Sequence, residues 1–77
     1  MANILIVENN QETLGKLTEI LDQAGFQSES CCNLKEACEF NLDRFDAIVC
    51  NLRLPASPGT EIIKHTSTPV LFTSNFA

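Results

Sequence analysis

Unbroken apolar runs mark the strands that this chain is expected to form. Residues 3–7 (NILIV) and 45–50 (FDAIVC) are apolar nearly throughout, which is typical of strands buried on both faces of a parallel sheet. Residues 69–74 (PVLFTS) form a further run that starts with proline. Residues 26–31 (FQSESC) alternate apolar and polar side chains, which indicates an edge strand with one face in water. The pattern therefore predicts strands distributed along the whole chain.

Helical periodicity fills the intervals between these strands. The first interval has apolar residues at steps of three and four, namely Leu14, Leu17, Ile20, Leu21 and Ala24. Asn10 stands where an N-cap belongs, and Gly25 stands where a left-handed C-cap belongs. Asn33 and Glu36 have the spacing of a capping box, which predicts a second helix. A third, short helix is predicted over residues 59–65.

The order β-α-β-α-β-α-β predicts an α/β fold with an open parallel sheet, (βα)3β, in which residues 1–77 form a single domain. Ligands of such sheets bind at the carboxyl ends of the strands. Three polar segments follow the predicted strands, at residues 8–10, 51–53 and 73–75. We expect any functional site to lie among these segments.

Charge and composition exclude several classes of function. The net charge is −5, and the cationic residues are scattered along the chain: Lys16, Lys35, Arg44, Arg53 and Lys64. Binding to nucleic acid needs clustered Lys and Arg, so we expect no nucleic-acid partner. The apolar runs are too short to span a bilayer, and no signal peptide precedes them. We therefore expect a cytoplasmic protein that does not bind membranes.

The cysteines do not have the spacing of a metal site. Cys31, Cys32, Cys38 and Cys50 form no C-x-x-C pair, and His65 is the single histidine. We expect the cysteines to be small, buried apolar residues in a reducing compartment, with no metal and no cofactor. A metal or redox role for them is the alternative.

Several segments together resemble the receiver domain of two-component response regulators (CheY-like). ILIVENN is similar to the first strand of that family with its acidic cluster, and EILDQAGF to the end of its first helix. FDAIVCNLRLP is similar to the third strand with the phosphoacceptor loop, and TPVLFTS to the fourth strand. The resemblance covers essentially the whole chain and implies a shortened flavodoxin-like receiver fold, without the segments that would follow the fourth strand.

Residue by residue, the resemblance implies a degenerate phosphorylation site. Glu8 and Asn9 fall on the acidic pair that holds Mg²⁺ in the family, and Asn51 falls on the phosphoacceptor position. Thr73 matches the hydroxyl position, while the family's lysine has no counterpart before Ala77. An amide is a poor nucleophile and a weak Mg²⁺ ligand. We therefore expect a chain that is not phosphorylated, binds no metal and is not an enzyme.

The predicted function is a receiver-like interaction module that binds a protein partner, either a histidine kinase, a response regulator or another signalling protein. A homodimer is expected as well, because the last strand would be an uncharged sheet edge. Ile4, Ile6, Val70 and Phe72 would also be partly bare on one face of the sheet or the other. The candidate contact residues are Arg53, Leu54, Pro55, Val70, Phe72 and Phe76. The alternatives are a phosphotransfer-competent receiver with Mg²⁺ and a fragment of a larger regulator.

Overall fold

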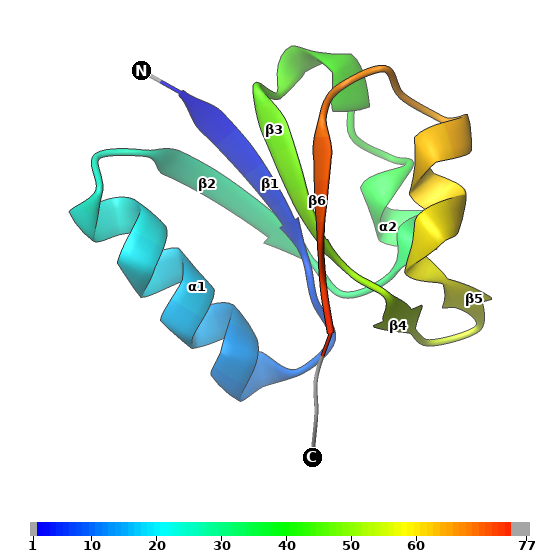
Figure 1. The fold of residues 1–77 in the computed structure, drawn as a ribbon, viewed down its shortest axis with the longest axis horizontal. Helices are drawn as coiled ribbons and strands as arrows, with labels where there is room; N and C mark the ends of the chain where they lie inside the picture. Colours follow the sequence, from blue (N-terminus) through cyan, green and yellow to red (C-terminus); the bar gives the residue numbers. More distant parts are fainter. Residues whose placement is uncertain (1, 75–77) are drawn as a thin grey trace.

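A parallel four-stranded sheet forms the centre of the computed structural model, which describes residues 2–74 (Figure 1). Its strands are β1 (Asn3–Val7), β2 (Gln27–Cys31), β3 (Ala47–Asn51) and β6 (Val70–Thr73), in the order β2-β1-β3-β6. All neighbouring pairs are parallel. The predicted strands, their parallel arrangement and the (βα)3β order are confirmed.

Helix α1 (Gln11–Gln23) packs against β1 and β2 on one face of this sheet (Figure 1). The predicted N-cap is confirmed, because Asn10 Oδ1 accepts a hydrogen bond from Thr13 N at 3.0 Å. Gly25 ends the helix with a φ of 87°, a left-handed conformation that glycine adopts without steric cost. The apolar spacing and its two flanking signals thus predicted this helix.

Three short helical segments cover the other face: α2 (Leu34–Ala37), η1 (Leu42–Arg44) and η2 (Gly59–Lys64). Asn33 caps α2 as predicted, with its side chain accepting from Glu36 N at 2.8 Å. The third predicted helix, however, is a 3₁₀ helix. A 3₁₀ helix rises about 2.0 Å per residue against about 1.5 Å for an α-helix, so a short segment can still run back along the sheet. None of the helices described in residues 2–74 could cross a membrane.

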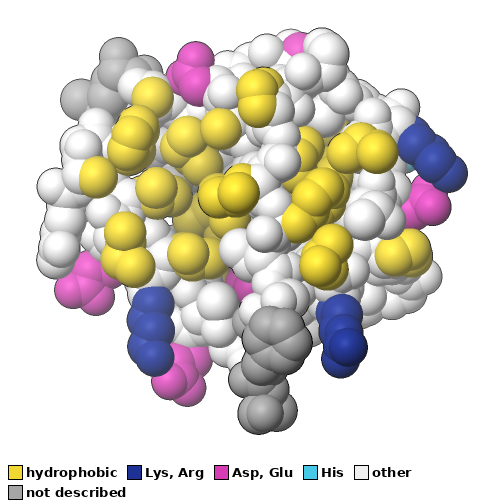
Figure 2. Space-filling model, in the orientation of Figure 1, with side chains coloured by type: hydrophobic (Ala, Val, Ile, Leu, Met, Phe, Trp, Pro, Cys, Tyr) yellow, Lys and Arg dark blue, Asp and Glu magenta, His cyan; other side chains and the backbone are white. Residues whose placement is uncertain are grey.

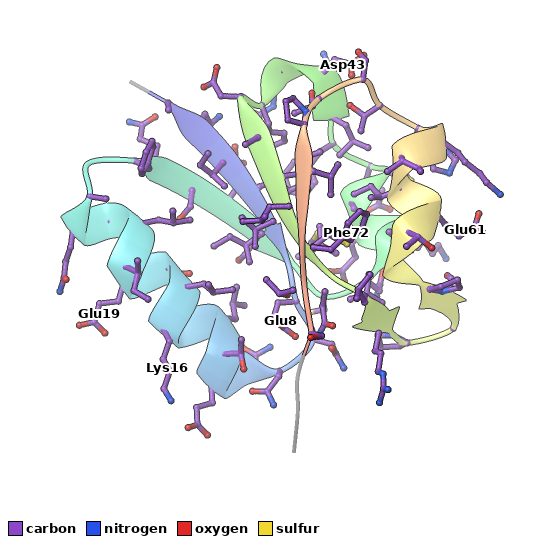
Figure 3. The ribbon with its side chains drawn as sticks, in the orientation of Figure 1. Glu8, Lys16, Glu19, Asp43, Glu61 and Phe72 are labelled. Atoms are coloured by element: carbon purple, nitrogen blue, oxygen red, sulfur yellow. The ribbon has the colours of Figure 1, made fainter. Side chains whose placement is uncertain are left out.

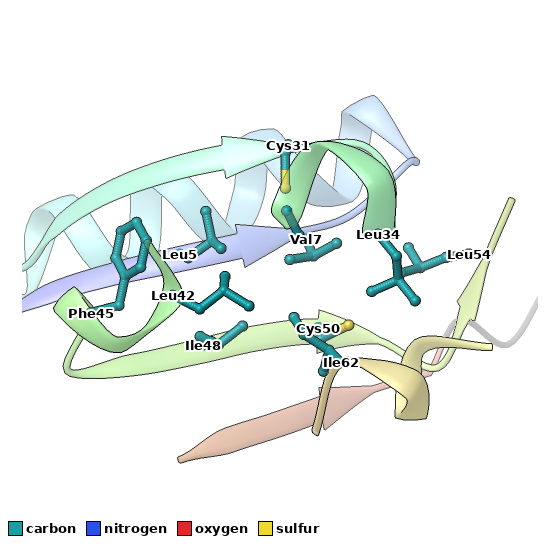
Figure 4. Packing of buried hydrophobic residues seen from close by; sticks show 11 residues of the cluster. Leu5, Val7, Cys31, Leu34, Leu42, Phe45, Ile48, Cys50, Leu54 and Ile62 are labelled. Carbon is teal, nitrogen blue, oxygen red and sulfur yellow. The ribbon is translucent and has the colours of Figure 1, made fainter. Parts of the chain in front are cut away.

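The core lies between the sheet and these short helical segments (Figure 4). Alternate residues of β1 and β3 point into it, because successive side chains of a strand face opposite sides. The cluster consists of Leu5, Val7, Cys31, Leu34, Ala37, Leu42, Phe45, Ile48, Cys50, Leu54 and Ile62. Val70 and Phe72 of β6 are half-buried against it, so most of their apolar surface serves the core.

The face that carries α1 is less completely covered. No residue of α1 is buried, and Ile20 is 61% exposed. Leu71, at the centre of β6, is 66% exposed, and Figure 2 shows apolar side chains spread over this view of the molecule. The expectation that Ile4 and Ile6 would be bare is wrong, since β1 is an inner strand under α1 and buries both. On this face the exposed apolar side chains lie on α1 and on β6, and on the opposite face Ile63 of η2 is also exposed.

The four free cysteines differ in their exposure to solvent. Cys31 and Cys50 are buried as predicted, whereas Cys38 is exposed and Cys32 half-buried. Cys38 lies outside the core because α2 ends at Ala37, after a single turn. Burial raises the pKa of the Cys31 thiol to about 12, with a further contribution from nearby Glu36. The two buried thiols are therefore protonated and unreactive near neutral pH.

Candidate functional site

The strand ends bring together the residues that sequence analysis singled out. Glu8 directly follows β1, Asn51 ends β3, and Thr73 ends β6 in register with Asn51. Glu8 and Asn51 are each 1% exposed, although polar residues after a strand usually face water. Figure 3 shows Glu8 beneath the end of β6. These three residues therefore lie together at the carboxyl edge of the sheet, where the sequence predicts a functional site.

The side chain of Asn51 makes two hydrogen bonds that fix its orientation. Its Nδ2 donates to Glu8 Oε2 at 2.8 Å, and its Oδ1 accepts from Arg53 N at 2.9 Å. An ionised carboxylate only accepts and a backbone N–H only donates, so the amide can satisfy both in one orientation alone. Asn10 N gives Glu8 Oε2 a second donor, at 3.1 Å. Asn51 thus holds the start of its loop against the buried Glu8 carboxylate.

Two polar atoms of the site have no hydrogen-bond partner among residues 2–74. These are Glu8 Oε1 and Thr73 Oγ1, and both are buried. A buried polar atom without a partner costs about 1–3 kcal/mol, and more if it is charged. The Asn51 amide and the Asn10 N–H therefore offset only part of the cost of burying Glu8.

The receiver resemblance implies a Mg²⁺ site here, but the residues present do not fit one. Mg²⁺ needs several hard oxygen ligands in octahedral geometry. Asn51 turns its N–H, not its oxygen, toward Glu8, and its Oδ1 already binds the Arg53 N–H. Within residues 2–74, no group of three or more Asp, Glu, His or Cys side chains is placed to hold a metal ion. The amide hydrogen of Asn51 supplies the positive partner that a cation would otherwise give to Glu8.

Gly59 and Cys50 pack directly against this site. A β-carbon at Gly59 would lie 1.9 Å from the Asn51 carbonyl oxygen and 3.2 Å from Cys50 Sγ. Gly59 N also donates to the carbonyl of Leu52 at 2.8 Å. Burial, with a further contribution from the Glu8 charge, raises the pKa of the Cys50 thiol to about 11. Cys50 is therefore a neutral packing residue near neutral pH.

The loop after β3 folds into a small hairpin of β4 (Arg53–Leu54) and β5 (Ser57–Pro58). Of the predicted contact residues, Arg53 and Pro55 are exposed, whereas Leu54 is buried in the core. A cavity of about 200 Å³ lies beside the hairpin, between Pro55–Ser57 and Asn33–Lys35. A wider groove of about 1300 Å³ between α1 and β2 has both polar and apolar walls and does not include Glu8 or Asn51.

The remaining predicted residues lie at the margins of the site. Asn9 is exposed and makes no side-chain hydrogen bond among residues 2–74. Phe76 lies outside the described residues. Sequence reasoning missed Gly59, for which the Pro-Gly pair before a short helix was the available signal. It also missed Leu71, because the uniformly apolar PVLF run does not reveal which side chain the sheet leaves exposed.

Solved structures of the same architecture are response-regulator receiver domains. The receiver domain of HemR from Leptospira biflexa, in its non-phosphorylated form, is 30% identical, with a TM-score of 0.85 over 96% of this chain. CheY4 of Vibrio cholerae is 25% identical, with a TM-score of 0.77 over 94%. A CheY-like receiver domain of Methylobacillus flagellatus is 24% identical and shares the fold, with a TM-score of 0.86 over 99%.

The chain is shorter than these structures. It spans 64% of the HemR chain, 67% of the CheY4 chain and 71% of the Methylobacillus flagellatus chain. No family model and no curated protein sequence matches it. The parallel sheet with strand order β2-β1-β3-β6 and these solved structures agree on the fold. The chain is similar to CheY-like response-regulator receiver domains and adopts their fold in a shortened form.

Proposed function

We propose that this chain is a non-phosphorylatable receiver module of two-component-type signalling, which acts by binding a partner protein. One observation carries the proposal: the Asn51 amide donates a hydrogen bond to the buried Glu8 carboxylate at 2.8 Å. The residue at the phosphoacceptor position is thus a structural donor. An interaction role is compatible with every contact at this end of the sheet, whereas phosphoryl transfer is not.

Chemistry and access both oppose phosphoryl transfer at Asn51. The amide has no anionic oxygen and is a poor nucleophile. Its Oδ1, the nearest equivalent of an attacking oxygen, is already bound to Arg53 N and is buried. The Glu8 carboxylate, which would have to help hold Mg²⁺, accepts the Asn51 N–H. These contacts support a site that stays in one state whatever the supply of phosphoryl donors.

The surface around the site is the part that a partner could use. Arg53 and Pro55 are exposed beside the 200 Å³ cavity, which could admit one side chain of a partner. Loops at the carboxyl ends of strands commonly carry binding function. We propose that a histidine kinase or a response regulator is the partner, since receiver modules work with such proteins. The Arg53 side chain would then pair with an acidic group of that partner.

Reversing the charge of Arg53 tests this surface. Arg53→Glu should weaken binding to a panel of histidine kinase and response regulator domains by about tenfold, the cost of roughly 1.4 kcal/mol that a lost interfacial ion pair can reach. Lys64→Glu is the matched control, because Lys64 is an exposed cation at the end of η2. Calorimetric titration gives the affinities. Equal losses from both variants, or no binding partner in the panel, would contradict the proposal.

A further inference from the structure

We propose that β6 is a dimerisation edge, where it pairs antiparallel with β6 of a second copy of this chain around a two-fold axis at Leu71. The proposal rests on the backbone and side chains of β6 alone and is independent of the signalling role. Three observations carry it: the free edge, the exposure of Leu71, and the absence of charge along the strand.

The outer edge of β6 has unpaired backbone groups. In the described sheet, β6 is the last strand and pairs with β3 alone. The carbonyls of Pro69 and Thr73 accept from Ile48 N and Leu52 N at 2.9 and 2.8 Å, so alternate residues 69, 71 and 73 face β3. The N–H and C=O groups of Val70 and Phe72 therefore point outward. Such an edge is a template for pairing with another strand.

Leu71 is the large apolar residue with the highest exposure in the described chain, at 66%. Its backbone is locked into the sheet beside Val49, so the side chain cannot turn inward to the core. Val70 and Phe72, its neighbours, are half-buried on the opposite face. The uncovered apolar surface of this strand thus gathers at Leu71 and on the same face as α1.

The charge distribution favours a second copy at this edge. The chain has a net charge of −5, so two copies repel each other at most surfaces. No charged residue occurs between Thr66 and Ser74. Natural sheets protect free edges with proline or with charged side chains, especially lysine, and β6 has neither between Val70 and Thr73. Two copies can meet here without opposing like charges.

An antiparallel pair centred on Leu71 satisfies both the backbone and the side chains. Val70 lies opposite Phe72 of the second copy, and each such pair exchanges two N–H···O bonds. Leu71 then lies opposite its own counterpart at a non-hydrogen-bonded position, where the side chains are closest. The two sheets join into one continuous sheet, with both copies of α1 on the same face. The closed two-fold leaves no further β6 edge for additional copies.

A site-directed disulfide tests this register. The buried thiols of Cys31 and Cys50 have pKa values raised to about 12 and 11, so replacing Cys32 and Cys38 by serine leaves no reactive native thiol. In that background, Leu71→Cys should form a covalent dimer under mild oxidation, seen on a non-reducing gel. Ile20→Cys is the matched control, because Ile20 is a 61% exposed apolar residue of α1, a helix that packs on β1 and β2 and not on β6. Equal cross-linking of both variants would overturn the proposal.

Sedimentation equilibrium provides the second measurement. The unmodified chain should sediment as a dimer of the 8.5 kDa protomer. Leu71→Lys should lower the association constant at least tenfold, so that the variant sediments as a monomer. Ile20→Lys should leave the dimer intact, and circular dichroism should show that both variants are folded. A monomer at all micromolar concentrations, a species larger than a dimer, or a Leu71→Lys variant that still dimerises would each overturn the proposal.

Discussion

Gly59→Ala should destabilise the protein by about 3 kcal/mol or more, a large part of the roughly 5–15 kcal/mol that stabilises a small domain. The new β-carbon would lie 1.9 Å from the carbonyl oxygen of Asn51, a contact that only a backbone shift can relieve. That shift would move either the end of β3 or the start of η2, and with it the bond from Gly59 N to the Leu52 carbonyl. Denaturant unfolding followed by circular dichroism measures the loss.

The same substitution at Gly15 is the control. Gly15 lies inside α1, and a β-carbon there would meet nothing within 4 Å. Gly15→Ala should therefore stabilise the protein by about 0.5–1 kcal/mol, because alanine has the higher helix propensity. If the two variants changed stability in the same direction and by similar amounts, the close packing of Gly59 against the site would be contradicted.

Asn51→Asp should be the most damaging single change at the site itself, with an expected loss of about 3 kcal/mol at neutral pH. The substitution replaces the N–H that faces Glu8 Oε2 at 2.8 Å with a second carboxylate oxygen, inside a site that is 1% exposed. It removes a charge-assisted hydrogen bond, which contributes about 1.5–3 kcal/mol, and adds a buried repulsion. Thermal unfolding at several pH values measures the loss.

The pH dependence of this variant has a definite sign. Two carboxylates in contact would keep one proton in the folded state, whereas both lose their protons above about pH 4 when the chain is unfolded. The unfolded state then binds fewer protons, so the stability of Asn51→Asp should fall relative to wild type between about pH 4 and pH 7. Millimolar Mg²⁺ should restore part of the lost stability, because the cation offsets the repulsion between the two carboxylates.

Asn9→Asp is the matched control, because it makes the same chemical change at the exposed neighbour of Glu8. It should alter stability by less than about 0.5 kcal/mol, as surface substitutions usually do. A wild-type stability for Asn51→Asp at pH 7, or a loss that is independent of pH, would contradict the hydrogen bond between Asn51 and Glu8.

Much of the fold could be predicted because several signals agreed locally. The apolar runs of β1 and β3 indicated buried parallel strands, and Asn10 with Gly25 marked the ends of α1. The resemblance of the strand ends to receiver domains then indicated that Glu8, Asn51 and Thr73 would meet. These features depend on local periodicity and on the fixed geometry of parallel sheets.

The features that could not be predicted depend on tertiary contacts. Neither the 3₁₀ form of η2 nor the close approach of Gly59 to the backbone of Asn51 is encoded in the periodicity of the sequence. The exposure of Leu71 and the burial of Ile6 depend on where α1 lies over the sheet. Burial of Leu54 results from the β4–β5 hairpin, which the sequence of the proline-containing loop did not predict.

Intact-mass spectrometry after incubation with acetyl phosphate and Mg²⁺ measures whether this chain accepts a phosphoryl group. Because Asn51 donates a hydrogen bond to Glu8, we expect the site to take up no phosphoryl group. A receiver domain with an aspartate acceptor, treated in parallel, shows that the reagent is active. The mass of this chain should stay unchanged throughout the incubation. A gain of one phosphoryl group that hydroxylamine removes would contradict the account.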